Sequence, residues 1–164
     1  MKTMPCAMTF QEERFTAARA ELEPLARAHW DEVEAPLHGQ RAYRLHVGHY
    51  RTLERLDMLA LYTARTAGGQ LAGYAAFSLA PCPHRPGLLL AVLDGLYLTP
   101  AARQGLTALA FLRWAERRLT ARGAGAVQYS SPASRPCGAL YRRLGAACTE
   151  TVWHKALPVA GEVA

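Results

Sequence analysis

A long apolar segment that leads through a short loop directly into an amphipathic helix is the feature of this sequence that most constrains its fold. Leu88–Leu98 is apolar enough for a strand buried on both faces, and Thr99–Pro100 ends it. Asp94-Gly95 within this run is also a two-residue turn signal, but too few residues follow it to form a return strand. We therefore predict one central strand with a bulge or kink at Gly95, where the missing side chain permits the distortion.

After Pro100 the hydrophobic pattern changes from that of a strand to that of a helix. Apolar residues recur at spacings of four, three and four, and arginine and glutamate occupy the other side. Gly123 suits the end of this helix. The apolar positions are Ala108, Leu112, Ala115 and Leu119.

Two further apolar runs precede the central strand. Leu59–Thr66 and Leu71–Leu79 are joined by Ala67–Gln70, which predicts a hairpin of two antiparallel strands. Upstream of this hairpin, His46–Leu56 predicts a short helix or an ordered loop.

The N-terminal segment Thr9–Glu34 contains helix formers, with apolar residues close to the spacing of one helical face. Thr9 and Glu12 match a capping box at its start. Pro24 predicts a break or two shorter helices, because proline removes an amide donor and clashes with the preceding turn. We expect the helical region to end around Pro36–Gly39.

Three shorter elements complete the pattern. Ala126–Tyr129 predicts a strand, Pro136–Leu144 predicts a short helix that ends at Gly145, and Thr149–Leu157 predicts a final strand. The order is therefore helices, three strands, helix, strand, helix and strand, which indicates an α/β fold of the α+β type.

The length and the hydropathy of the chain fit one ordinary domain. A chain of 164 residues is long enough to bury one hydrophobic core but too short for two cores of ordinary size. We expect a single domain over 1–164, with a helical region at about 9–56 and a core at about 59–157. No run approaches the roughly 20 apolar residues of a membrane-spanning helix, and the N-terminus lacks a secretory pattern. These features predict a soluble, cytoplasmic protein with no membrane partner.

Charge and cysteine content narrow the expected partners. The formal net charge of +6 favours an anionic partner: nucleic acid, a membrane surface or a phosphate-rich cofactor. The arginines are scattered beside glutamates rather than gathered in a block, which argues against nucleic-acid binding as the main task.

The cysteines are far apart in the sequence and show no metal-binding or disulfide pattern. We interpret them as free thiols and expect no metal: Cys6, Cys82, Cys137 and Cys148.

The loop between the central strand and the following helix is the stretch that carries chemistry. A helix N-terminus presents unpaired amides and a partial positive charge, so the small-residue loop Gln104–Ala108 could wrap a pyrophosphate with backbone N–H groups. Arg103 would add a charge-assisted contact. Strand–loop–helix turns that bind no anion are also common, so an ordinary connection stays open on this pattern alone.

This loop resembles the signature of the GNAT acyltransferases. In that family, Arg or Gln is followed by two residues, Gly, one residue and then Gly or Ala, after a strand end, a spacer and Pro. Here Leu96–Pro100 supplies the strand end, Arg103 the first motif position and Ala108 the last. Leu106 stands at the position of the central glycine, and Gly105 lies one residue earlier.

A second matching segment is Leu140–Gly145, which is similar to the short terminal helix of the same family. With the element order, the resemblance covers Leu59–Leu157. It implies a mixed, mostly antiparallel sheet flanked by helices, in which the central strands around Leu96 and Val127 splay apart. It also implies that acetyl-CoA lies in the resulting cleft and that a primary amine attacks it directly. A homodimer through the terminal strands would be compatible with this family.

The resemblance implies roles for individual residues. Tyr141 occupies the position from which a phenol approaches the coenzyme sulfur, so it would act as the acid, although a tyrosine packed under the helix is the structural alternative. Asp94 stands where many relatives carry an acidic residue facing the cleft, so it would act as the base unless it only stabilises the bulge. Backbone amides of Leu96–Leu98 would stabilise the oxyanion. The implied cofactor contacts are Leu96, Tyr97, Leu98, Arg103, Gln104, Gly105, Leu106, Thr107 and Ala108.

Other assignments remain open on the sequence. His29, on an apolar helix face, and His84, in the loop Cys82–Gly87, are alternatives as the base or as acceptor contacts, because the unperturbed pKa of histidine lies near physiological pH. Water could also serve as the base, and no motif identifies the amine. Two other functions compete: a GNAT-fold module that binds coenzyme A or regulates without efficient transfer, suggested by Leu106, and a basic nucleic-acid-associated domain.

Overall fold

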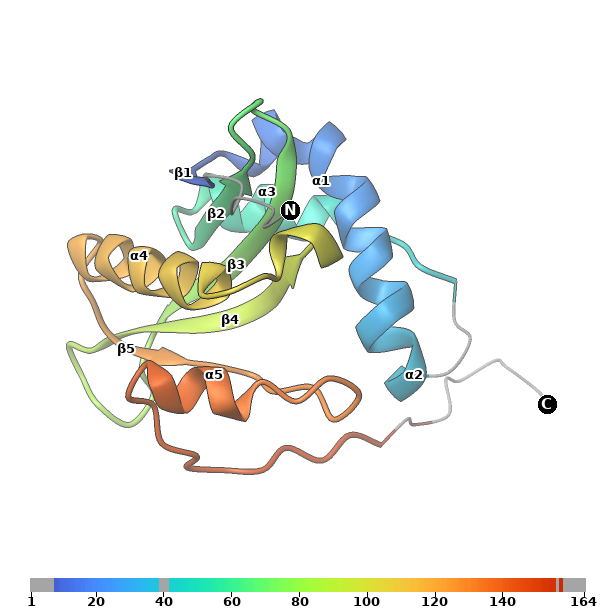
Figure 1. Ribbon diagram of the computed structural model, residues 1–164. Helices are drawn as coiled ribbons and strands as arrows, with labels where there is room; N and C mark the ends of the chain where they lie inside the picture. Colours follow the sequence, from blue (N-terminus) through green and yellow to red (C-terminus); the bar gives the residue numbers. More distant parts are fainter. Residues whose placement is uncertain (1–7, 39–41, 156, 158–164) are drawn as a thin grey trace.

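A single five-stranded sheet forms the centre of the protein in the computed structural model, which describes residues 8–38, 42–155 and 157 (Figure 1). The strand order is β1-β2-β3-β4-β5; all neighbours are antiparallel except β4 and β5, which are parallel. The strands are β1 (Thr9–Glu12), β2 (Leu59–Arg65), β3 (Leu71–Pro81), β4 (Leu89–Leu98) and β5 (Ala124–Gln128). The helices are α1 (Phe15–His29), the π-helical turn η1 (Trp30–Glu34), α2 (Ala35–His38), α3 (Val47–Arg55), the 3-10 turn η2 (Pro100–Ala102), α4 (Thr107–Ala121) and α5 (Gly138–Arg143).

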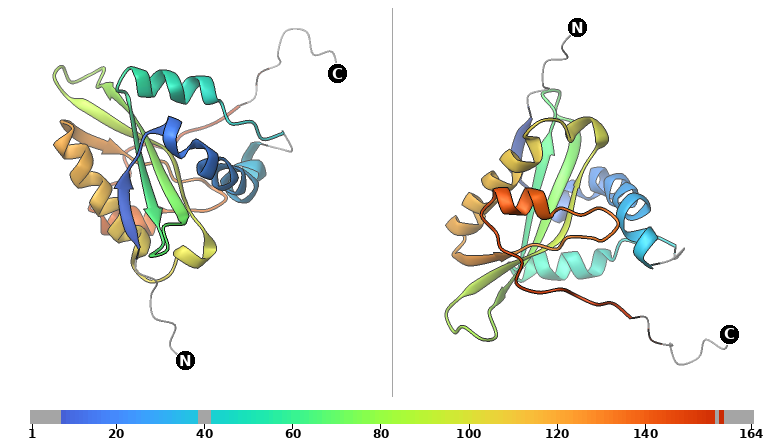
Figure 2. Two further views of the ribbon diagram at one scale, coloured as in Figure 1. Left: turned by 90° about the horizontal axis from the view of Figure 1, so that it is seen from above. Right: turned by 60° about the horizontal axis from the view of Figure 1, so that its bottom comes forward.

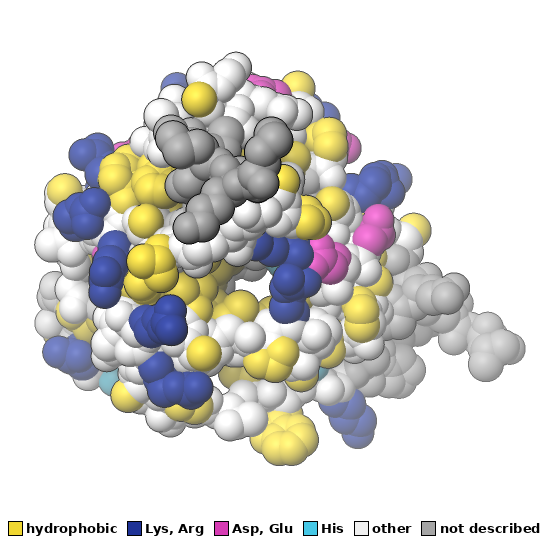
Figure 3. Space-filling view, viewed as in Figure 1, with side chains coloured by type: hydrophobic (Ala, Val, Ile, Leu, Met, Phe, Trp, Pro, Cys, Tyr) yellow, Lys and Arg dark blue, Asp and Glu magenta, His cyan; other side chains and the backbone are white. Residues whose placement is uncertain are grey.

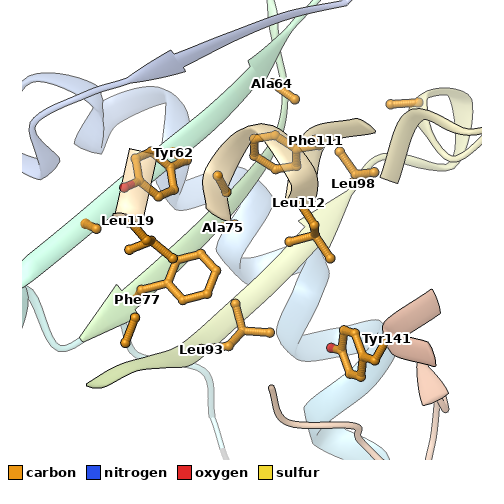
Figure 4. Close-up of a cluster of buried hydrophobic side chains, with 14 of the residues drawn as sticks. Tyr62, Ala64, Ala75, Phe77, Leu93, Leu98, Phe111, Leu112, Leu119 and Tyr141 are labelled. Carbon is orange, nitrogen blue, oxygen red and sulfur yellow. The ribbon is translucent and has the colours of Figure 1, made fainter. Parts of the chain in front are cut away.

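Helices cover both faces of the sheet. Helices α4 and α5 pack on one face, and α1 and α3 pack on the other (Figure 2). The core beneath α4 combines side chains from the strands with the buried face of that helix, and Tyr141 of α5 lies at its border (Figure 4). This core includes Tyr62, Phe77, Leu93, Phe111, Leu112 and Leu119. The predicted α+β architecture and the mostly antiparallel sheet are confirmed.

Strand β4 contains the predicted bulge. Gly95 pairs with Ala76 and Leu93 pairs with Phe77, so Asp94 is an extra residue without a partner on β3. Because side chains alternate between the two faces of a strand, one extra residue reverses the alternation. Asp94 is thereby exposed within an otherwise apolar strand.

The predicted separation of the central strands is also present. β5 pairs with β4 only along residues Leu89 to Val92 of β4. The last pair joins Val92 of β4 to Gln128 of β5. Beyond these residues the two strands diverge, so the edge of β4 from Leu93 to Leu98 has no neighbour on the β5 side in the part of the chain that the structure describes.

The predicted N-terminal helix is wrong in its first turn. Thr9–Glu12 is the edge strand β1, and α1 begins at Phe15. The ring of Phe10 packs 5.0 Å from that of Phe111 and 6.1 Å from that of Trp114, measured between centroids. Helical periodicity could not reveal this arrangement, because distant aromatic partners on α4 hold the strand in place.

The predicted break at Pro24 is also wrong. Pro24 lies inside the continuous helix α1 and is exposed, so water can solvate the carbonyl that loses its partner. Buried Leu22 and Ala26 flank it, and their burial against the sheet offsets the cost of proline in a helix, about 3 kcal/mol. The helix then continues through η1, and α2 ends at His38, within the predicted range.

The predicted final strand is wrong. Residues 149–155 form no strand, and Trp153 is 90% exposed. The segment contains residues that favour strands, such as Thr151, Val152 and Trp153, but no neighbouring strand pairs with it in the described structure. Of the terminal strands through which we expected a homodimer, β5 is present and the last one is absent from the described residues.

The remaining predicted elements are confirmed. The hairpin is β2 and β3, the short helix after His46 is α3, and α4, β5 and α5 fall within a few residues of their predicted bounds. Gly123 follows α4 with φ of 90°, as a helix-ending glycine does. Cys82, Cys137 and Cys148 are free thiols, whereas Cys6 lies outside the described residues. No helix among the described residues is long and apolar enough to cross a membrane.

Candidate active site

An open cavity of about 70 Å³ lies where β4 and β5 separate. In Figure 3 a hollow with hydrophobic walls is visible between β4 and the segment that follows β5. β4 supplies one wall, α1 and η1 a second, and α5 with the loop after β5 a third. The polar and backbone groups of its lining come from His29, Glu34, Asp94, Leu96, Ser130, Arg135, Cys137 and Tyr141.

Tyr141 is held at this cavity by packing and by one hydrogen bond. Its side chain is 7% exposed, and its ring stacks on that of Tyr129 at a centroid distance of 4.7 Å. The hydroxyl donates to the carbonyl oxygen of Ser130 at 2.7 Å. Burial raises the pKa of Tyr141 well above its usual value, and Cys137 raises it further. The phenol is therefore protonated at physiological pH and can act as a proton donor.

Asp94 reaches the cavity because of the bulge in β4. Its Oδ2 accepts a hydrogen bond from the hydroxyl of Tyr50 on α3. Burial and the nearby carboxylate of Asp94 raise the pKa of Tyr50 far above its usual value, so this hydroxyl remains a donor. Sequence reasoning missed Tyr50, since no local pattern connects α3 with β4.

His29 lies at the end of α1, on the opposite side of the cavity from Tyr141. Its Nδ1 is 2.7 Å from the hydroxyl of Tyr74, and its ring stacks on that of Tyr97 with centroids 5.5 Å apart. Burial lowers the pKa of His29, and this effect outweighs the opposing attraction of Glu34, whose Oε1 is 3.8 Å from Nε2. The imidazole is therefore neutral at physiological pH. The structure brings Asp94, His29 and Tyr141 to one cavity.

Two backbone amides of β4 face the divergent edge of the strand. The amide of Thr99 donates to the carbonyl of Ala72 at 2.8 Å, so Thr99 bonds toward β3. Backbone groups alternate in direction along an antiparallel strand, so Tyr97 also bonds toward β3, whereas Leu96 and Leu98 face away from it. The carbonyl of Leu98 accepts from Arg103 on this outer side, in agreement with the alternation.

The loop from Arg103 to Ala108 turns the chain from β4 into α4. Gly105 has φ of 61°, in the left-handed region that favours glycine. Leu106 precedes the first residue of α4, makes no side-chain capping hydrogen bond and is 62% exposed. The first amides of α4 have no partner within the helix. The amide of Thr107 donates outside it, to the carbonyl of Gln104 at 3.3 Å, and the hydroxyl of Thr107 donates to the same carbonyl at 2.9 Å. The conformational role of a glycine thus falls on Gly105, one residue before the family position.

Arg103 does not point its guanidinium at this loop. Its Nη1 and Nη2 donate to the two carboxylate oxygens of Glu32 at 2.6 and 2.7 Å, and its Nε donates to the carbonyl of Leu98 at 2.6 Å. Direct contact of its side chain with a pyrophosphate therefore stays a prediction. Sequence reasoning missed Glu32, because nothing local in the sequence links it to Arg103.

His84 lies away from the site. It occupies the exposed turn between β3 and β4, next to the start of β4, whereas the cavity lies along the later half of that strand (Figure 1). The structure therefore does not bring His84 together with Asp94, His29 and Tyr141. The loop Cys82–Gly87, which we considered as part of the acceptor site, lies with it.

Replacing Gly105 by alanine is expected to lower the free energy of unfolding by about 1–2 kcal/mol, because a side chain makes the left-handed conformation costly. An added Cβ would meet no heavy atom within 4 Å, so the backbone conformation alone accounts for the cost. Gly68→Ala is the matched control, since Gly68 lies in another loop without a positive φ. Urea unfolding of both variants measures the difference; an equal effect would show that the conformation of Gly105 is not strained by a side chain.

Solved structures provide the comparison with known proteins. The ribosomal-protein-alanine N-acetyltransferase from Brucella melitensis biovar Abortus 2308 matches with a TM-score of 0.70 and 20% identity, over 92% of this chain and 100% of that chain. AAC(6')-Iy, solved with the bisubstrate analogue CoA-S-monomethyl-acetylneamine, has a TM-score of 0.68 and 19% identity, over 93% and 99%. A predicted acetyltransferase with acetyl-CoA from Clostridium acetobutylicum has a TM-score of 0.68 and 12% identity, over 92% and 96%.

Comparison of the sequence alone finds no related protein. No family model matches the chain, and no curated protein matches it. At the identities of the solved structures the likeness concerns the fold, and it covers nearly the whole chain.

Proposed function

We propose that this chain, which has the GNAT fold, is an N-acetyltransferase that transfers the acetyl group of acetyl-CoA to a primary amine. The observation that carries the proposal is the meeting of three side chains with the divergent edge of β4 in one cavity: Asp94, His29 and Tyr141. Similar structures named as acetyltransferases, including one with acetyl-CoA, support the same reaction class.

The divergent edge of β4 fits the demands of an acyl-CoA cosubstrate. The outward amides of Leu96 and Leu98 are positioned as donors to carbonyl groups, including the acyl oxygen on which negative charge develops. The loop Gln104–Ala108 and the uncapped N-terminus of α4 would hold the pyrophosphate through backbone amides, aided by the helix dipole. A bound acetyl-CoA supplies an activated thioester, and the remaining chemistry belongs to the backbone amides and side chains of this protein.

Proton transfer in this proposal is divided between the two sides of the cavity. Asp94 takes the proton of the attacking amine, directly or through water, while Tyr50 keeps its carboxylate in place. His29 is the alternative base, since burial keeps it neutral. Tyr141 donates a proton to the departing thiolate, which would replace the carbonyl of Ser130 as the acceptor of its hydrogen bond.

The charge of the cavity favours a cationic acceptor. Asp94 and Glu34 line it together with Arg135, whose guanidinium is ion-paired with Glu32. Neither Asp94 nor Glu34 is ion-paired with an Arg or Lys side chain among the described residues. Glu34 instead contacts His29 and His38. Because the charge of Arg135 is already paired with Glu32, the carboxylates of Asp94 and Glu34 give the acceptor side of the site a negative potential in a chain of net charge +6. We therefore propose an amine that carries a second positive charge.

A module that binds coenzyme A without efficient transfer is the second candidate. It is favoured by Leu106 at the position of the motif glycine and by the pairing of Arg103 with Glu32, which withdraws that guanidinium from the loop. Such a module would bind acetyl-CoA and release no thiol when an amine is added.

Titration of the protein with acetyl-CoA in moderate salt, followed by a thiol-release assay, tests the proposal. We expect saturable binding, and release of free coenzyme A that is faster with a linear diamine than with a monoamine of equal length, because the second ammonium group interacts with Glu34 or Asp94. Binding without release would indicate the non-transferring module. An absence of binding would rule out both, and salt-sensitive binding to duplex DNA would then point to a nucleic-acid-associated domain.

A further inference from the structure

A π-helical turn interrupts the long N-terminal helix beside the candidate active site. Turn η1 lies between α1 and α2 and contains Glu32 at its middle position. π-helical turns are rare, and they occur frequently at functional sites because the extra residue redirects neighbouring side chains. In Figure 1 the helix that contains this turn runs past the loop after β4 and the loop after β5.

Glu32 contacts three segments that are distant in the sequence. Both of its carboxylate oxygens accept hydrogen bonds from Arg103, and Oε2 also accepts from the hydroxyl of Tyr97 at 3.1 Å. Arg135, in the loop after β5, also donates to Oε1. Arg103 itself is fixed on the end of β4, since it donates to the carbonyl of Leu98 and lies over the ring of Tyr97 at 4.9 Å.

These contacts join the two sides of the cleft. Arg103 follows β4 and Arg135 follows β5, and the two strands are not paired beyond Val92 and Gln128. Glu32 therefore connects the loops at the divergent end of the strands, where sheet hydrogen bonds do not. A second connection is parallel to it, because Ser134 Oγ donates to the carbonyl of Val33 at 2.6 Å.

The ion pair between Glu32 and Arg103 stays charged throughout the physiological pH range. Hydrogen bonds from Arg103 lower the pKa of Glu32 to about 2, so its carboxylate is ionised throughout the physiological range. The side chains of Glu32 and Arg103 are both less than one-third exposed, which limits solvent screening. Paired charge-assisted hydrogen bonds of this kind fix geometry as well as adding attraction.

We infer that Glu32 is a positioning residue for the coenzyme, in that it holds the loop after β4 and the loop after β5 at a fixed separation. The inference rests on the proposed binding of acetyl-CoA in this cleft. A cleft with a fixed width spares the cosubstrate the cost of ordering both loops when it binds. The acceptor-side helix and the cofactor cleft are thereby parts of one rigid assembly, and Glu32 affects coenzyme affinity without contact with the reacting atoms.

Calorimetric titration with acetyl-CoA and steady-state kinetics of Glu32→Gln test this role. We expect the Kd and the KM for acetyl-CoA to rise about tenfold, with kcat changed less than about twofold, because the chemistry is left in place. Glu21→Gln is the matched control: Glu21 forms a similar bidentate pair with Arg65, but between α1 and the end of β2, and neither residue lines the cavity. Its Kd is expected to equal that of the wild type.

Each outcome separates the inference from the proposed function. If the wild type does not bind acetyl-CoA, the proposed function fails. If the wild type binds and Glu32→Gln has the same or a higher affinity, the positioning role is overturned; higher affinity would mean that Glu32 competes with the coenzyme phosphates for the arginines. Ser134→Ala provides a milder change at an exposed residue if Glu32→Gln does not fold, and a Kd about twofold to threefold higher is expected.

Discussion

Replacing Tyr141 by phenylalanine is expected to lower kcat about 10²- to 10³-fold, while the affinity for acetyl-CoA stays within about twofold of the wild type. The change removes the only group that we propose as the proton donor for the departing thiolate. The phenyl ring keeps the stacking on Tyr129 and the packing against the core of α4, so the shape of the cleft is preserved. Thiol release under saturating substrate measures kcat, and calorimetric titration measures affinity.

The neighbouring tyrosine provides the control for this experiment. Tyr129 is half-buried and also has a raised pKa, but its hydroxyl donates to Glu116 at 2.8 Å. Tyr129→Phe therefore removes the same atom from the same stacked pair without removing the proposed acid. If Tyr141→Phe keeps full activity, or if both variants lose the same amount, Tyr141 acts only in packing and another group or water protonates the thiolate.

The parts of the fold that the sequence predicted are those with local causes. Helix α4 follows from its own apolar spacing, and the bulge in β4 follows from a charged residue beside Gly95 in an apolar strand. The hairpin of β2 and β3 follows from the turn residues that join them. Each of these patterns lies within one element or two consecutive elements, so no distant contact is needed to interpret it.

The errors occurred where distant contacts decide the structure. β1 is a strand because Phe10 finds aromatic partners on α4, and α1 is continuous because residues on both sides of Pro24 are buried against the sheet. The segment around Trp153 contains residues that favour strands but has no strand to pair with in the described structure. Local pattern specifies which face of an element is apolar, but not whether a partner covers that face.

The same division applies to the candidate site. Asp94 and Tyr141 were identified because they stand at positions of the GNAT motifs, and the structure places both on one cavity. Tyr50 and Glu32 belong to helices that no motif covers, and their contacts with Asp94 and Arg103 depend on the packing of the N-terminal helices over β4. The groups that support the site therefore required the three-dimensional structure.

Replacing Asp94 by asparagine is expected to lower kcat/KM at neutral pH about 10²- to 10³-fold. The variant loses both contributions of the carboxylate, the acceptance of a proton from the amine and the attraction of a cationic acceptor. Asparagine is nearly isosteric and can still accept the hydrogen bond from Tyr50 through its amide oxygen, so the bulge in β4 and the affinity for acetyl-CoA should be retained.

His29→Gln and the pH dependence of kcat/KM distinguish the two possible bases. A base must be deprotonated to act, so if His29 is the base, activity falls as the pH drops through its pKa. Because burial lowers that pKa, the loss would occur below pH 6.5, and His29→Gln would abolish this limb of the profile. If Asp94→Asn retains activity while His29→Gln loses it, the base is His29, and Asp94 serves to hold the bulge. If Asp94→Asn loses activity and His29→Gln retains both activity and the acid limb, proton transfer depends on the carboxylate that the bulge exposes.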